Sequence, residues 1–159
     1  MSAEERLLLR HTVATLAYRS RKVLVDTPPG FAAFQAAEGA RSAVQILAHM
    51  GDLFDWALSI ADGRQAWKDE TPLPWDEEVH RFYATLRRFD DRLAEPAELK
   101  APAAGLFQGP IADALTHLGQ IAQLRRLAQA PVKGENYHKA EIVAGRIEPG
   151  TQAAPRREF

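Results

Sequence analysis

Residues 42–61 of the chain read SAVQILAHMGDLFDWALSIA, which is the pattern of a helix with one buried face. Ser42 and Gln45 form a capping box that begins this helix, and Asp62-Gly63 ends it. The apolar residues that lie at helical spacing from His49 are Ile46, Leu53, Trp56 and Ile60. The segment therefore predicts a helix that turns an imidazole toward an apolar core.

Three further segments show the helical pattern. The first runs from about residue 3 to residue 25 and stops at a turn-forming run, Asp26-Thr27-Pro28-Pro29-Gly30. The second begins near Pro74 and has acidic residues in its first turn, where the helix dipole favours negative charge. The third opens at Gly109-Pro110 and runs to about Ala130, before Pro131.

Four amphipathic helices of about 20 residues without any strand pattern predict an all-α fold, a four-helix bundle. In chain order, the first helix ends near residue 25 and the third begins near Pro74. Connections of roughly 15 residues after these two helices are long enough to cross the bundle, so up-down-up-down order is not required. We expect residues 1–131 to form the bundle. Residues 132–159 are rich in Gly, Pro and charge and predict an irregular C-terminal tail with at most one helical turn, near residues 139–144. This tail either packs on the bundle or is partly disordered.

The composition is that of one globular domain without a strong charge. The 159 residues include 20 Lys and Arg against 21 Asp and Glu, so there is no electrostatic case for a nucleic-acid partner or an acidic membrane. The chain has no cysteine, which excludes disulfides, thiolate ligands and cysteine nucleophiles. The start Met-Ser-Ala-Glu-Glu lacks the parts of a signal peptide, and no apolar run approaches the roughly 20 residues that span a bilayer. We expect a cytoplasmic protein with a small-molecule partner.

A candidate site combines His49 with Asp113 and His117 on the fourth predicted helix. Asp113 and His117 are one turn apart and differ by only about 40° around the helix axis, so both can reach one ion. Two imidazoles and a carboxylate from separate helices make a three-ligand metal site with open positions, and such a set suits Zn, Ni, Fe, Co or Mn. The same residues also fit a plainer interpretation, in which the histidines are hydrogen-bonded core residues and Asp113 compensates the helix dipole.

Further side chains are candidates for lining this site. Asp52 follows His49 by three residues and is a rival carboxylate, although its neighbours indicate a more solvated flank. Gln120 follows His117 by three residues and can hydrogen-bond a ligand or a neighbouring helix. The segment 134–137 either folds over the open side of the site or remains a surface tail. The candidate lining residues are His11, Asp52, Trp56, Gln120 and Tyr137.

These segments resemble the DinB/YfiT-like superfamily of four-helix-bundle, metal-dependent proteins. The resemblance covers most of the chain and is carried by ILAHMGD at residues 46–52, by the following WAL at 56–58, and by DALTHLGQI at 113–121. The last of these is similar to the family pattern H-x-x-x-H-R-G-Q-I. It implies a divalent metal, commonly Ni or Zn, with His49 and His117 at the first and last of three histidine positions. Asp113 stands in place of the middle histidine, and Leu118 in place of the family arginine, so no role of that guanidinium carries over.

The resemblance also implies a chemistry. Characterised relatives include thiol-dependent S-transferases and a maleylpyruvate isomerase branch that uses a thiol cofactor. We therefore expect a divalent-metal-dependent enzyme of the transferase type, whose metal lowers the pKa of a substrate thiol. The alternative is a non-catalytic module that binds a small ligand or a partner subunit, with structural histidines. A homodimer fits either function.

Overall fold

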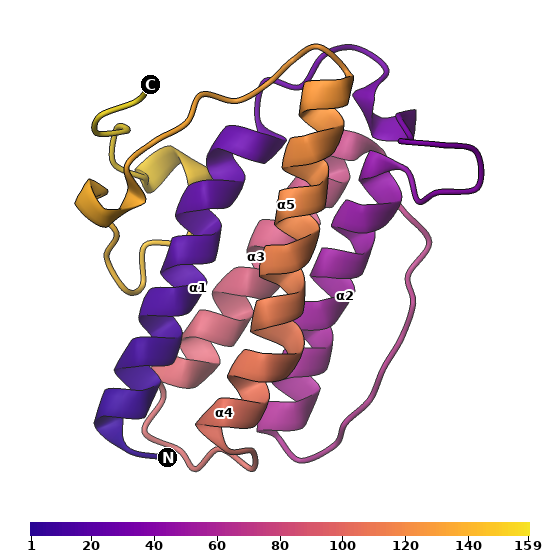
Figure 1. Cartoon of the computed structure of the whole chain (residues 1–159). Coiled ribbons are helices and arrows are strands. Elements are labelled where there is room, and N and C mark those ends of the chain that lie inside the picture. The colour runs from indigo at the N-terminus through magenta and orange to yellow at the C-terminus, as the bar shows by residue number, and fades with distance from the viewer.

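The computed structural model describes residues 1–159 and is all-helical, with no strand. Its four long helices lie side by side (Figure 1). They are α1 (Ala3–Leu24), α2 (Ala43–Ala61), α3 (Trp75–Ala94) and α5 (Ala112–Leu127). No helix combines the length and the apolar character that crossing a membrane requires.

The limits of the first three helices agree with the sequence prediction within a few residues, because local signals set them. The predicted capping box of α2 is present: the Ser42 hydroxyl accepts a hydrogen bond from the Gln45 backbone N–H, and the Gln45 side chain accepts one from the Ser42 backbone N–H. The helix α3 begins directly after Pro74.

The fourth helical segment begins earlier than predicted. It starts at α4 (Ala103–Leu106), passes through a π-helical turn (Phe107–Ile111) and continues without a break into α5. Pro110 therefore lies inside the helix rather than at its first position. Proline has no N–H to donate to the preceding turn, and a π-helical turn is a common way to absorb such an interruption. Leu106 and Ile111 are fully buried on either side of it, and their burial favours the added turns.

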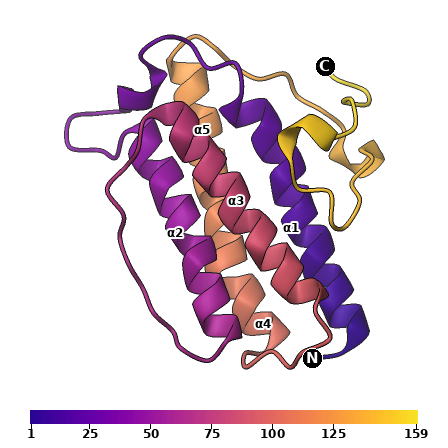
Figure 2. The same ribbon diagram turned by 180° about the vertical axis from the view of Figure 1, so that it is seen from behind.

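The helices do not alternate in direction along the chain. The end of α1 meets the start of α3, where the Trp75 indole donates to the Leu24 carbonyl, so α1 and α3 are antiparallel. The ends of α2 and α3 lie together, where Arg92 pairs with Asp62. Thus α2 and α3 are parallel neighbours, as both views of the ribbon show (Figures 1 and 2).

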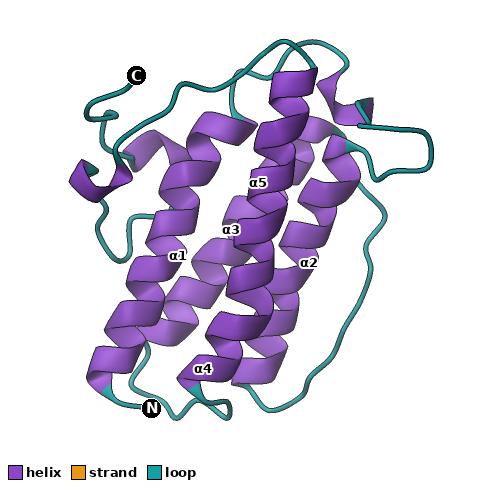
Figure 3. Ribbon diagram, viewed as in Figure 1, coloured by secondary structure: helices purple, strands orange, loops and turns teal.

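Because α2 and α3 are parallel, the connection between them has to return along the length of the molecule. Residues 62–74 do this as a loop without helix (Figure 3). When extended they reach about 40 Å, which exceeds the roughly 30 Å of a helix such as α2. The connection that crosses the length therefore follows the second helix, whereas the sequence allowed a crossing after the first and third helices.

A cluster of charged side chains joins α2, α3 and this connection. The Arg81 guanidinium on α3 donates to Glu78 at 2.5 Å, to Asp52 on α2 at 2.9 Å and to the Ala48 carbonyl at 2.7 Å. The second oxygen of each carboxylate accepts a backbone N–H of the connection, from Glu70 at Asp52 and from Leu73 at Glu78. Asp52 and Glu78 thus hold the connection against the helices, and Arg81 compensates their charge.

Arg125 is a basic residue in the last turn of α5. Its side chain is buried, and its guanidinium donates to the carbonyl groups of Val23, Val25 and Asp26 at the end of α1. The last carbonyl groups of a helix have no partners within the helix, so a cation there satisfies them and stabilises the helix dipole.

The tail after α5 packs along α1, on the side away from α2 (Figures 1 and 2). The Tyr18 hydroxyl donates to Glu135 at 2.6 Å, Arg87 pairs with Glu148, and Ile147 is fully buried. Its only helical pieces are two 3-10 turns, Tyr137–Lys139 and Pro149–Thr151. The sequence predicted at most one helical turn in the tail, near residues 139–144. This prediction is wrong, because the tail has two turns and residues 140–144 belong to neither.

Replacing Arg81 with Met should leave two buried carboxylates without their cation. We expect Arg81→Met to lower the free energy of unfolding by about 3–5 kcal/mol in urea denaturation at neutral pH. Burial already raises the pKa of Asp52, and the loss of Arg81 raises it further, so the deficit should shrink as the pH falls.

The matched control is Arg88→Met, since Arg88 also lies on α3 but forms an exposed pair with Asp55. That substitution should cost less than about 1 kcal/mol. Equal losses in the two variants would contradict the role given to the Arg81 cluster.

Candidate metal centre

Two helices bring together the three residues that the sequence predicted as ligands. His49 projects from α2, and Asp113 and His117 project from α5, which packs against it. The His49 Nε2 atom lies 3.7 Å from Asp113 Oδ2, and the His117 Nε2 atom lies 3.4 Å from Asp113 Oδ1. The two imidazole rings are 4.7 Å apart between centroids and perpendicular.

This arrangement can hold a metal ion. One donor atom from each residue lies within 4.8 Å of the other two. Two ligand atoms that each sit about 2.0–2.1 Å from a tetrahedral ion are roughly 3.4 Å apart, so only a small inward movement of the side chains is needed. The donors are nitrogen and oxygen only, and three protein ligands leave coordination positions for a further group.

Gln120 determines how His117 presents its nitrogens. The His117 Nδ1 atom lies 2.8 Å from Gln120 Oε1. An amide oxygen only accepts hydrogen bonds, so in this amide orientation Nδ1 carries the proton and the Nε2 lone pair is directed to the Asp113 side. Metal-binding histidines usually have such a partner on the second nitrogen.

The surroundings of His49 favour its neutral form. Burial lowers the pKa of His49, and the nearby His117 and Arg41 lower it further, while Asp113 and Asp52 act in the opposite direction. A neutral imidazole is the form that binds a metal. The His49 side chain is only 17% exposed, whereas Asp113 is 47% exposed, so the group is reached from solvent on the Asp113 side.

Two residues beside this group were not predicted from the sequence. Trp67, on the connection 62–74, packs its ring 5.4 Å from that of His49 and 5.8 Å from that of Trp56. Arg41 lines a cavity of about 410 Å³ together with His117, Gln120 and apolar side chains such as Ile46 and Leu124. Neither residue belongs to a helical pattern, so no periodic signal pointed to them.

The other predicted lining residues divide into two groups. Gln120 hydrogen-bonds His117, and Trp56 packs against Trp67 beside His49, so both lie near the trio. His11 is exposed on α1, and Tyr137 packs against Tyr18 at the far side of α1. The tail therefore does not fold over this group.

Asp52 is not a member of the group either. The sequence placed it on a solvated flank, but it is buried, and its carboxylate is taken up by Arg81 and by the Glu70 N–H. The correction has a physical cause: a cation from another helix compensates the charge, which the pattern within α2 cannot indicate.

Asp113 does not lie at a helix start. The helical segment begins at Ala103, more than two turns earlier, so the orphan N–H groups that make up the positive end of the dipole are remote from this carboxylate. The nearest groups with positive or metal-binding character are the two imidazoles.

The chain matches no family model, no curated protein and no solved structure.

Titration of His49 should report the charges around it. In metal-free protein its pKa should lie below the ordinary value of 6.5. Asp113→Asn removes a negative charge that favours the imidazolium and should lower this pKa further, whereas Arg41→Gln removes a positive charge and should raise it. The imidazole resonances followed by NMR against pH give all three values.

The same shift has a consequence for stability. Because the pKa of His49 is lower in the folded chain than in the unfolded chain, acid protonates the unfolded chain at a higher pH. The free energy of unfolding should therefore fall as the pH drops below 6.5. An unchanged or raised pKa in Asp113→Asn would contradict the placement of Asp113 beside His49.

Proposed function

We propose that the chain is a divalent-metal-dependent enzyme that acts on a small-molecule thiol. The observation that carries the proposal is the convergence of His49, Asp113 and His117, whose donor atoms lie within 4.8 Å of one another between two helices. The resemblance in sequence to DinB/YfiT-like proteins favours Zn or Ni, and the donor set also suits Fe, Co or Mn.

The arrangement of the helices supports the same family. The four long helices pack side by side and enclose a common apolar core, and we interpret them as a four-helix bundle of the DinB/YfiT-like type. Metal sites in bundles are assembled from side chains on facing helices, and α2 and α5 supply the trio in this way.

The residues around the trio suit a reaction on a bound thiol. A bound divalent ion would supply positive charge that lowers the pKa of a substrate thiol. Trp67 shields His49 from water on one side, and Gln120 holds His117 in the tautomer whose Nε2 is free. The adjoining cavity of about 410 Å³ offers apolar walls for the rest of the substrate, with Arg41 at its edge.

Metal content tests the first part of the proposal. Protein purified without added metal and analysed for elements should contain a stoichiometric divalent ion. His49→Ala and His117→Ala should lose it, and Asp113→Ala should retain it only weakly, because each change removes one of three ligands.

The controls are His80→Ala and His138→Ala, since both histidines are exposed and remote from the trio. They should leave the metal content unchanged. Wild-type protein that stays free of metal even after incubation with Zn²⁺ or Ni²⁺ would refute the metal centre and favour the non-catalytic module.

Thiol binding tests the second part. By calorimetry, the metal-loaded protein should bind 2-mercaptoethanol at least about tenfold more tightly than ethylene glycol, a difference of roughly 1.4 kcal/mol. This preference should vanish after treatment with a chelator. If the metal is present and the preference is not, the metal centre stands and its thiol substrate is wrong.

A further inference from the structure

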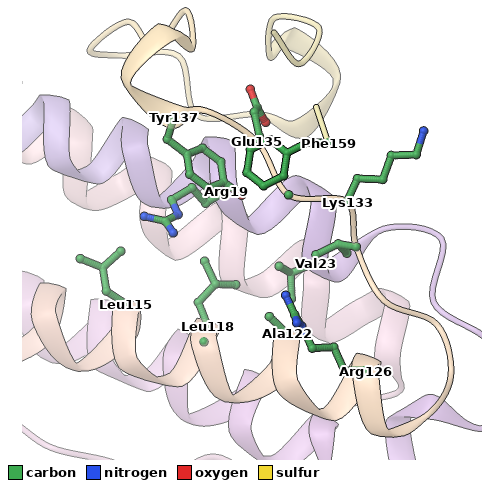
Figure 4. Close-up of a pocket in the computed structure, with 13 residues that line it drawn as sticks. Arg19, Val23, Leu115, Leu118, Ala122, Arg126, Lys133, Glu135, Tyr137 and Phe159 are labelled. Atoms are coloured by element: carbon green, nitrogen blue, oxygen red, sulfur yellow. The ribbon is translucent and has the colours of Figure 1, made fainter. Parts of the chain in front are cut away.

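A second cavity lies on the other side of α5 from the metal centre. It has a volume of about 460 Å³, within the ~300–1,000 Å³ typical of small-molecule sites. Its floor is aliphatic, with Leu118 and Ala122 from α5 and Val23 from α1 (Figure 4). The tail forms the opposite wall with the aromatic rings of Tyr137 and Phe159.

Helix geometry separates this cavity from the metal ligands. Ala122 follows Asp113 by nine residues in the same α-helix, which places it about 180° around the axis. None of His49, Asp113 and His117 lines the cavity. The two sites therefore share α5 and use opposite faces of it.

Three cations line the cavity without a carboxylate partner. Arg19, Arg126 and Lys133 form no ion pair, although all three lie in its walls. Arg126 reaches from α5 toward Val23, and Arg19 lies under the Tyr137 ring with its guanidinium carbon 4.2 Å from the ring centroid (Figure 4). Lys133 extends outward at the rim (Figure 4).

The one acidic residue in the lining does not neutralise these cations. The Glu135 side chain is fully buried, and its oxygens accept hydrogen bonds from the Tyr18 hydroxyl, the Lys22 ammonium and the Arg156 backbone N–H. The cavity therefore combines an apolar floor with positive charge that has no carboxylate partner in the protein.

The helix also leaves room in the cavity. Gly119 lies in the middle of α5 at the cavity wall, and a Cβ atom added there would meet no atom within 4 Å. Glycine in a helix interior costs about 0.5–1 kcal/mol relative to alanine, so a side chain is absent here although the space would accept one. This exposed position therefore leaves space beside the cavity that a bound ligand can occupy.

We propose that this cavity binds a small amphipathic anion, a carboxylate carried on an aliphatic body. The planar guanidinium groups of Arg19 and Arg126 match a carboxylate, and the floor of Val23, Leu118 and Ala122 matches a hydrocarbon chain. A purely apolar ligand would leave the cations without a partner, and an anion without a hydrocarbon chain would leave the apolar floor uncovered.

Calorimetry with octanoate, and with octanol as its neutral analogue, tests the proposal on chelator-treated full-length protein, so that the carboxylate has no metal to bind. Octanoate should bind about tenfold more tightly than octanol, since a charge-assisted hydrogen bond contributes on this order. Arg126→Gln should remove most of this difference, and the control Arg88→Gln, on the surface of α3, should not.

Filling the cavity gives the second arm. Gly119→Leu should weaken octanoate binding by at least about tenfold while the protein stays folded by circular dichroism, since the new side chain enters open space and favours the helix. Thr116→Leu adds bulk at an exposed position of the same helix outside the cavity and should leave binding unchanged.

Four results would overturn the proposal. The first is that octanoate shows no saturable binding, and the second is that octanoate and octanol bind equally. The third is that Gly119→Leu leaves octanoate binding unchanged. The fourth is that Gly119→Leu changes the oligomeric state seen by sedimentation and not the affinity for octanoate. The last would identify a second copy of the chain as the occupant. None of these results depends on the metal centre.

Discussion

The pairing of Arg81 with Asp52 and Glu78 is the interaction on which the arrangement of the molecule depends. It lets α2 and α3 lie parallel, because it also fixes the connection between them. In each carboxylate one oxygen accepts a hydrogen bond from the guanidinium, and the other accepts one from a backbone N–H of the returning connection. Gly51 makes the approach possible, since a Cβ there would lie 2.8 Å from the guanidinium. A buried ion cluster contributes little net stability by itself, but breaking it leaves uncompensated charge, so it selects one register of the two helices.

That register reaches the candidate metal centre through Trp67. The connection that the cluster anchors at residues 70 and 73 carries Trp67 alongside His49 and Trp56. The aromatic wall lowers the exposure of His49, and burial is the main reason that its pKa is low. A structural ion cluster one turn away from His49 thus contributes to the protonation state that a metal ligand needs.

The helix α5 serves both candidate sites. The π-helical turn at residues 107–111 precedes Asp113, and turns of this kind are frequent at functional sites because they change the direction in which the following side chains project. From that point one face carries Asp113 and His117 toward α2, while the opposite face and the tail enclose the cationic cavity. The tail, which Glu135 and Ile147 hold against the helices, therefore forms one wall of the proposed anion site.

Caps, prolines and apolar spacing indicated the helices and turned His49 and His117 inward, because these signals act between residues a few positions apart. The four-residue spacing between Asp113 and His117 predicted Asp113 as the third ligand. Local rules failed at Pro110, where burial of Leu106 and Ile111 continues the helix on the N-terminal side of the proline, and at Asp52, which is charged and buried. They also gave no sign that Arg125 is buried. A charge leaves water only when partners from other segments compensate it, and those partners, like Trp67 beside His49, are placed by the packing of helices far apart in the sequence.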